Sequence, residues 1–334
     1  MEEGILSAIG RTPIVKLRRI FPDAKFSLFG KLEGLNPGGS MKDRPAINII
    51  RQALEGGLIG PRTTVVESSS GNMGIGLAQA CSYHGLRFIC VVDPKATLQN
   101  IRLLEAYGAE VDMVSVPDPV TQEFLKARID RVQSLLFSIE DSFWPNQYSS
   151  IHNSGAHHQT MAEIASRFDW DVDYVFCATS TCGTMRGCVE YVRDSRMRTK
   201  VIAVDAVGST IFGGQRARRL IPGHGAAIRP DLYQSGLADG CIHVTDLECV
   251  IGCRRLARRE AILAGGSSGA VIMAIDSMKD IIPAGATCVA ILADRGERYL
   301  DTIYSDDWVT GHFGDVSHRW NEFKSEESIE TAYV

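Results

Sequence analysis

Lys42 follows two glycines and a serine and stands directly before an apolar helical pattern. The pattern predicts a helix through residues 45–55 that is capped by Ser40 and holds Lys42 in its first turn. The positive end of the helix dipole disfavours a further positive charge, so it lowers the pKa of the lysine amine. An imine-forming nucleophile requires such an amine. A solvated lysine at a helix start is the alternative for this loop alone, and the P-loop pattern is not met.

A second loop, residues 67–76, combines serines, an asparagine and glycines between a strand pattern and a helix pattern. Hydroxyls, an amide and the free N–H groups of a helix N-terminus suit a carboxylate ligand. A dinucleotide fingerprint is the alternative, because Gly74 and Gly76 provide its first part. Gln79 stands where that fingerprint needs a small residue, so the carboxylate interpretation is favoured.

A third loop, residues 178–187, is rich in serine and threonine and again leads from a strand pattern to a helix pattern. Clustered hydroxyls and backbone N–H groups at a helix start can form a phosphate cup. An ordinary Ser/Thr turn is the alternative for this loop by itself. A fourth loop, residues 264–270, precedes an apolar helix, and residues 294–300 carry two arginines.

Short apolar runs alternate with longer amphipathic stretches, and these elements must position the loops. Strands are predicted at residues 26–31, 64–67, 88–92, 110–114, 174–177, 201–204, 242–244 and 287–291. Helices are predicted at residues 45–55, 75–83, 98–106, 120–136, 185–193, 247–263 and 270–278. This alternation predicts an α/β fold with parallel sheets and helices on both faces. Ligands in such folds bind at the carboxyl ends of strands.

The composition argues against several classes of protein. The formal net charge is −5 over 334 residues, so no basic face for nucleic acid is expected. The nine cysteines form no CxxC pair and the histidines show no metal-site spacing, which favours free thiols and no metal. The sequence shows neither a signal peptide nor an apolar stretch of membrane length. We therefore expect a cytoplasmic protein that acts on small molecules.

In their order and spacing, the loops resemble the cysteine synthase/cystathionine β-synthase family of fold-type-II pyridoxal-phosphate enzymes. The resemblance rests on residues 9–13 (IGRTP), 37–44 (PGGSMKDR), 69–74 (SSGNMG), 146–148 (NQY) and 180–184 (STCGT). It implies two three-layer α/β/α domains with mostly parallel sheets and the active site between them. The expected parts are a smaller domain of residues 38–148 with a mobile part at about 80–135, a larger phosphate-binding domain of residues 1–37 and 149–315, and a polar C-terminal tail of residues 316–334.

The resemblance also implies roles for single residues. Lys42 would form the Schiff base with pyridoxal 5'-phosphate and act as the catalytic base. Asn72 would bond to the ring oxygen of the cofactor, and Ser267 would face its pyridine nitrogen. The phosphate cup would comprise Ser180, Thr181, Cys182, Gly183 and Thr184. The substrate would be bound by Ser69, Ser70, Gly71, Asn72, Met73, Gln147, Tyr148 and Arg128.

The implied reaction is β-replacement on a serine-derived amino acid through an aminoacrylate. A neutral hydroxyl at Ser267 does not keep the ring nitrogen protonated as an aspartate would, which favours elimination over transamination. Departures from the sulfhydrylase pattern, namely Met73, Ser180, Cys182 and Asp294, look closer to the N-(2-amino-2-carboxyethyl)-L-glutamate synthases of staphyloferrin B-type siderophore biosynthesis.

Members of that branch are described as joining O-phospho-L-serine to L-glutamate on the way to 2,3-diaminopropionate. Two alternatives stay open. One is a cysteine synthase that uses O-acetylserine or O-phosphoserine, and the other is a catalytically inactive homologue that binds a ligand or a partner. Family members are commonly homodimers, which the resemblance implies here as well.

Overall fold

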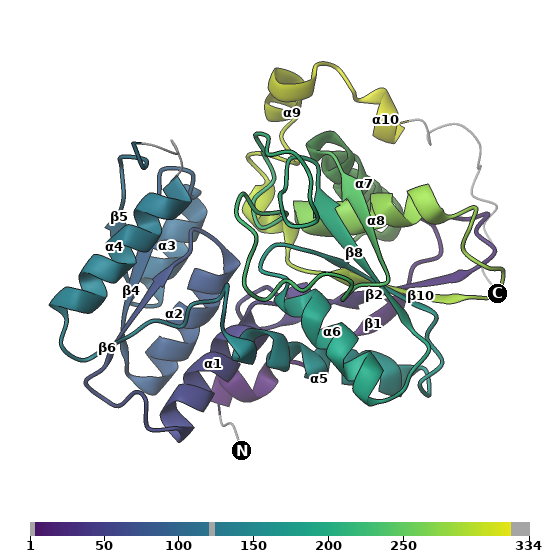
Figure 1. Ribbon diagram of the computed structural model, residues 1–334. Coiled ribbons are helices and arrows are strands. Elements are labelled where there is room, and N and C mark those ends of the chain that lie inside the picture. The colour runs from purple at the N-terminus through teal and green to yellow at the C-terminus, as the bar shows by residue number, and fades with distance from the viewer. Residues whose placement is uncertain (1–3, 120–123, 322–334) are drawn as a thin grey trace.

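The computed structural model of the protein describes residues 4–119 and 124–321, which form two β-sheets covered by helices (Figure 1). The larger sheet contains, in spatial order, β1 (Ile14–Lys16), β2 (Ser27–Leu32), β10 (Thr287–Leu292), β7 (Tyr174–Ala178), β8 (Lys200–Ala206) and β9 (Gly240–Val244). The smaller sheet contains β5 (Glu110–Met113), β4 (Arg87–Val92), β3 (Thr64–Ser68) and β6 (Ser142–Phe143). Every pairing is parallel except that of β1 with β2.

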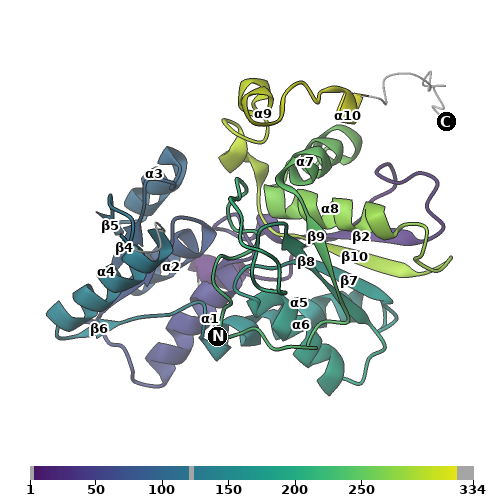
Figure 2. The same cartoon turned by 45° about the horizontal axis from the view of Figure 1, so that its top comes forward.

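Helices cover both faces of each sheet, so each half has three layers, as predicted. On the large sheet, one face carries α7 (Asp246–Glu260) and α8 (Gly266–Met278), and the other carries α5 (Ile151–Arg167) and α6 (Gly183–Asp194) (Figure 2). On the small sheet, one face carries α1 (Asp43–Glu55), α2 (Asn72–His84) and α3 (Leu98–Ala106), and the other carries α4 (Phe124–Ser138).

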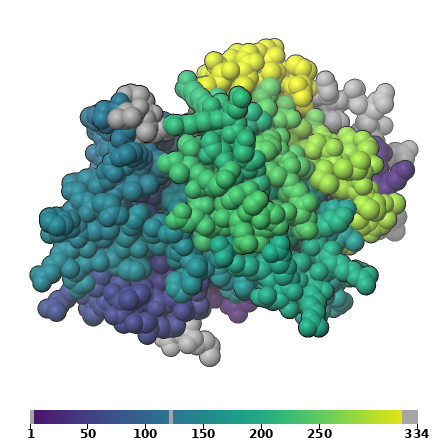
Figure 3. All heavy atoms as spheres, in the orientation of Figure 1, coloured from purple at the N-terminus to yellow at the C-terminus, as the bar shows by residue number. Residues whose placement is uncertain are grey.

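The remaining helices are short. They are the 3-10 turns η1 (Gly4–Ala8), η2 (Glu33–Leu35) and η3 (Gly296–Tyr299), and the C-terminal α9 (Asp306–Phe313) and α10 (His318–Asn321). The α10 residue Trp320 is buried, and its ring lies 4.6 Å from the Arg254 guanidinium of α7. In the space-filling view, the small-sheet half (blue) covers the left of this face and the large-sheet half (green to yellow) covers the rest (Figure 3).

The strands are continuous apolar runs because both of their faces are buried. In β4, Phe88, Cys90 and Val92 pack with α1 and α2, whereas Ile89 and Val91 pack with α4. A fully buried side chain of this size contributes about 1.5–3 kcal/mol, so such a strand is held strongly from both sides. This double burial makes a parallel sheet recognisable in a sequence.

All eight predicted strands are present, with ends within two residues of those predicted. The sequence missed β1 and β6, which are two or three residues long and lie at sheet edges. It also missed α5, because the buried face of that helix carries polar side chains that hide the apolar period: Asn153, Ser154, His157 and Thr160. The expected start of α4, residues 120–123, lies outside the described residues, as do residues 322–334 of the expected tail.

A buried ion-pair network joins α1 to the large sheet. The Arg44 Nε of α1 lies 2.7 Å from Glu33 Oε2, and its Nη2 lies 2.7 Å from Glu163 Oε2 on α5. The side chains of Arg44 and Glu33 are almost completely buried. Breaking a buried pair by removing one partner is costly, about 3–5 kcal/mol, so this network fixes the helix that begins just after Lys42.

Candidate active site

Lys42 occupies the N-cap position of α1, one residue before the first turn in which the sequence placed it. Its backbone N–H donates to the Ser40 hydroxyl at 3.1 Å, so Ser40 braces the preceding turn and is not itself the N-cap. Burial lowers the pKa of the Lys42 amine, and the nearby Asp294 carboxylate opposes this shift. Burial therefore lowers this pKa in addition to the effect expected from the helix dipole. Among the described residues, none is hydrogen-bonded to this amine.

The expected phosphate cup lies between β7 and α6 and is braced by α5. The Asn153 amide donates to the Thr181 hydroxyl at 3.2 Å, and the Thr184 hydroxyl is paired with His157 Nε2 at 3.3 Å. A Cβ at Gly183 would lie 2.3 Å from Asn153 Oδ1, so only glycine fits there. These contacts hold the free N–H groups at the start of α6 in a fixed cradle, which suits a phosphate.

Two positions of this cup carry side chains where the sulfhydrylase pattern has glycine. Cys182 keeps a left-handed backbone, with φ of +65°, although only glycine adopts it without strain. Its side chain is buried, and burial raises the pKa of the thiol to about 12. Cys182 is therefore a neutral thiol at neutral pH, while Ser180 is partly exposed at the same loop.

The expected carboxylate loop connects β3 to α2. The Ser69 hydroxyl accepts a hydrogen bond from the Gly74 N–H at 3.0 Å, which closes the turn. Met73, in the first turn of α2, is buried in the core of the small-sheet half. A Cβ at Gly71 would meet no atom within 4 Å, so the space beside the loop is open. The loop thus offers N–H groups and hydroxyls next to free space, as carboxylate binding requires.

Arg128 reaches this loop from α4. Its Nη1 donates to the Ser70 hydroxyl at 2.8 Å, and its Nε lies 3.2 Å from Asp93 Oδ2. Only 12% of the Arg128 side chain is exposed. Burial raises the pKa of the Tyr148 phenol, and the cations of Arg128 and Arg219 oppose the rise. Two arginines from different parts of the chain therefore lie near Tyr148, and the sequence did not single out Arg219.

Glu67 is a second residue that the sequence did not assign to the site. Its carboxylate accepts hydrogen bonds from Trp144 Nε1 at 3.1 Å and from the Gln147 backbone N–H at 3.2 Å. The Gln147 amide in turn donates to the Ser68 carbonyl at 3.3 Å. Burial raises the pKa of Glu67 to about 7. Glu67 thus fixes the segment that carries Gln147 against the end of β3.

Asp294 brings three of the loops together. Asn72 Nδ2 donates to its carboxylate at 2.7 Å, and the Gly265 N–H donates to its carbonyl at 3.3 Å. Ser267 follows in the first turn of α8, and its hydroxyl has no hydrogen-bond partner within residues 4–119 and 124–321. The Lys42 amine is close to the same carboxylate. Lys42 and Asn72 therefore lie at the Asp294 carboxylate, and the loop that leads to Ser267 is bonded to the Asp294 backbone.

The expected phosphate cup is linked to Lys42 through His157. Burial lowers the pKa of His157 well below its usual value, and the nearby Lys42 amine lowers it further. His157 is therefore neutral at neutral pH, and it is hydrogen-bonded to the Thr184 hydroxyl. An amine without a partner, a glycine cradle at a helix start and the amide of Asn72 fit the aldehyde, phosphate and ring oxygen of pyridoxal phosphate.

Two further arginines that could have served as anion ligands are occupied elsewhere. The Arg186 Nε donates to Glu190 at 2.7 Å, one turn along α6. Arg295 is exposed, and its Nη2 lies 2.9 Å from Glu297. Each of these two arginines is paired with a neighbouring glutamate, whereas Arg128 and Arg298 contact the carboxylate loop itself, at Ser70 and at Asn72.

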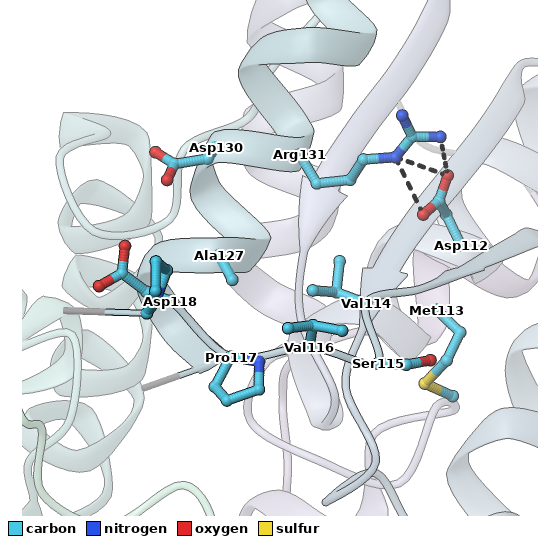
Figure 4. Close-up of a pocket in the computed structure, with 11 residues that line it drawn as sticks. Asp112, Met113, Val114, Ser115, Val116, Pro117, Asp118, Ala127, Asp130 and Arg131 are labelled. Carbon is cyan, nitrogen blue, oxygen red and sulfur yellow. Dashed lines mark hydrogen bonds and ion pairs between the residues drawn. The ribbon is translucent and has the colours of Figure 1, made fainter. Parts of the chain in front are cut away.

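A cavity of about 500 Å³ lies apart from these residues, between the end of β5 and α4 (Figure 4). Arg131 on the rim of this cavity is paired with Asp112 at 2.7 Å, and none of the predicted site residues lines the cavity.

Within the described part of the chain, no cluster of three or more His, Cys, Asp or Glu side chains could hold a metal. No helix in that part has the length and apolar character needed to cross a membrane.

Comparison with known proteins agrees with this geometry. The family profile described as pyridoxal-phosphate dependent enzyme matches residues 5–294. O-ureido-L-serine synthase has 30% identity and a TM-score of 0.84, covering 92% of this chain and 98% of its own. The O-acetylserine dependent cystathionine β-synthase of Helicobacter pylori has 31% identity and a TM-score of 0.84, covering 91% and 99%. The cysteine synthase of Entamoeba histolytica has 31% identity and a TM-score of 0.84, covering 91% and 91%. The chain therefore belongs to the fold-type-II pyridoxal-phosphate enzymes of the cysteine synthase/cystathionine β-synthase family, and it is a β-replacement enzyme.

Proposed function

We propose that this enzyme joins O-phospho-L-serine to L-glutamate and forms N-(2-amino-2-carboxyethyl)-L-glutamate and phosphate, on a route to 2,3-diaminopropionate and siderophores. The observation that carries the proposal is the nearly buried Arg128, whose guanidinium contacts Ser70 in the carboxylate loop. Arginine suits the planar oxygens of carboxylates and phosphates. Both proposed substrates are rich in these groups.

In this proposal the chain itself supplies the acid–base chemistry. Bound pyridoxal phosphate supplies the electron sink that makes the Cα proton of the donor amino acid acidic. The Lys42 Nζ, whose pKa burial lowers, accepts that proton and later returns it to Cα. The Cβ–O bond to phosphate breaks, the Cβ–N bond to the glutamate amine forms, and the amine releases one proton. The carboxylate loop at the start of α2 holds the donor carboxylate.

The two arginines near Tyr148, which lie there together with the carboxyl group of Glu67, support a nucleophile that carries carboxylates. Arg128 and Arg219 approach Tyr148 from α4 and from the segment between β8 and β9. Sulfide carries no carboxylate, so a sulfhydrylase has no need for two cations beside its nucleophile. Overall similarity does not select the nucleophile, because relatives named for different products are equally similar to this chain. Residues at the site must therefore decide it.

A competition experiment tests the proposal. The enzyme is offered O-phospho-L-serine or O-acetyl-L-serine together with equal amounts of glutamate and sulfide, and the products are identified by mass. We expect the glutamate adduct to dominate with the phosphorylated donor. Cysteine as the only product would overturn the assignment in favour of a cysteine synthase, and no product would favour an inactive homologue. Homodimer formation is part of the same proposal, and light scattering of the purified protein tests it.

A further inference from the structure

Both ends of the Asn72 side-chain amide are held by the segment that follows β10. Its oxygen accepts a hydrogen bond from Arg298 Nη1, and its nitrogen donates to Asp294 Oδ2 at 2.7 Å. An amide nitrogen carries two hydrogens, so one N–H of Asn72 stays available. A guanidinium can only donate and a carboxylate can only accept when ionised. The two partners therefore permit one orientation of the amide and exclude the flipped one.

Asp294 is itself fixed in place. It is 4% exposed, and the Tyr299 hydroxyl donates to the same Oδ2 at 2.5 Å. Its other oxygen is buried without a hydrogen-bond partner in the described residues, and a Cβ at Gly265 would lie 2.2 Å from it. Arg298 also donates to the Gly38 carbonyl, in the loop that carries Lys42. The same segment thus braces Asn72 and the lysine loop.

We propose that Asp294 and Arg298 are positioning residues that orient the Asn72 amide, so that its free N–H, and not its oxygen, is offered to the ring oxygen of pyridoxal phosphate. The inference rests on the role proposed for Asn72. A serine at position 294 would both donate and accept, so it would leave Arg298 alone to select the amide orientation. The aspartate therefore adds a second constraint, on the nitrogen end of the amide, to the one that Arg298 places on its oxygen end.

A double-mutant cycle on cofactor binding tests this idea. Binding of pyridoxal phosphate to N72A, D294S and N72A/D294S is measured by fluorescence titration, with wild type alongside. Removing a charge-assisted hydrogen bond in a buried site changes affinity by about tenfold, so D294S is expected to bind about tenfold more weakly than wild type. The double variant is expected to bind as weakly as N72A alone, because Asp294 acts through Asn72. The control D301S removes an exposed carboxylate further along the chain and should bind like wild type.

Two readouts separate positioning from a loss of folding. Melting temperatures of the cofactor-free variants show whether the fold persists, and the visible absorption band of the bound cofactor reports on the ring oxygen. We expect the band to shift in D294S and not to shift further when D294S is added to N72A. Where D294S does not fold, D294N replaces it in the same cycle.

Additive effects of D294S and N72A on affinity would overturn the proposal, as would wild-type affinity in D294S. Failure of wild type to bind the cofactor at all would instead contradict the proposed function. The two failures are therefore distinguishable within one titration series.

Discussion

The loops at the starts of α6 and α2 are built alike but braced differently. Each leaves a parallel strand, contains glycine and hydroxyl residues, and leads into a helix whose free N–H groups can bind an anion. In the α6 loop, Thr181 and Thr184 are paired with the neutral side chains of Asn153 and His157. In the α2 loop, Ser70 is paired with the charged Arg128.

Because of this difference, the two loops should respond differently to pH. The supports of the α6 loop are uncharged at neutral pH, since burial lowers the pKa of His157 well below its usual value. The supports of the α2 region are the ionisable side chains of Arg128, Asp294 and Glu67, which come from distant parts of the chain. We therefore expect the proposed phosphate cup to be insensitive to pH near neutrality, whereas the proposed substrate side depends on a balance of charges.

The largest effect is expected where the two loops meet, at Lys42. In the proposed mechanism, K42A removes both the covalent attachment and the base, and a lost general base alone lowers the rate by about 10²–10⁴-fold. Mass spectrometry after borohydride reduction should show the cofactor adduct in wild type and in the surface control K25A. An adduct that persists in K42A would show that another lysine holds the cofactor.

Matched glycine substitutions test the rigid cup against the open loop. In G183A the new methyl group would lie 2.3 Å from Asn153 Oδ1, and Asn153 is held by Gln147 and Thr181, so it cannot move freely. Overpacking of this kind costs about 1–3 kcal/mol of unfolding free energy, and we expect cofactor affinity to fall with it.

The matched control G71A adds a methyl group where no atom lies within 4 Å. We expect its unfolding free energy to change by less than about 0.5 kcal/mol, while its KM for the donor amino acid rises. Urea unfolding and steady-state kinetics measure both quantities. Equal losses of stability in the two variants would remove the contrast between the loops.

The R128A substitution tests the charged support of the α2 loop. It leaves Ser70 and the buried Asp93 without their cation, and we expect KM for the phosphorylated donor and for glutamate to rise by about tenfold or more. R128K should reverse only part of the rise in KM, because the ammonium group of lysine lacks the planar, forked geometry of a guanidinium. Turnover with O-acetylserine and sulfide should change much less, and an equal loss there would point to a general structural defect.

A smaller effect is expected from pH, through Glu67. Its pKa of about 7 in the folded protein is raised above the unfolded value, so the folded state holds that proton more tightly. The resulting stability is present at low pH and is lost as pH rises through about 7. Wild type should therefore lose about 2 kcal/mol relative to E67Q between about pH 5 and pH 8, by urea unfolding. A constant difference across this range would show that Glu67 does not titrate there.

Much of the fold and of the candidate site was predictable because it depends on local sequence patterns. The eight main strands alternate with helices in the sequence, and double burial makes each strand an apolar run. The loops around Lys42, Asn72 and Thr181 have residue types that suit their ligands. The helix α5 was not predictable, since its buried face is polar and its partners lie in other segments.

The sequence by itself determined the α/β class, the four loops and the chemistry available in them. Only the tertiary structure decided which side chains brace those loops. Asn72 and Asp294 are 222 residues apart, and Ser70 and Arg128 are 58 apart, so no local spacing relates them. The physical reason is that helix and strand patterns depend on near neighbours along the chain. Hydrogen bonds between loops instead depend on how the two sheets and their helices pack.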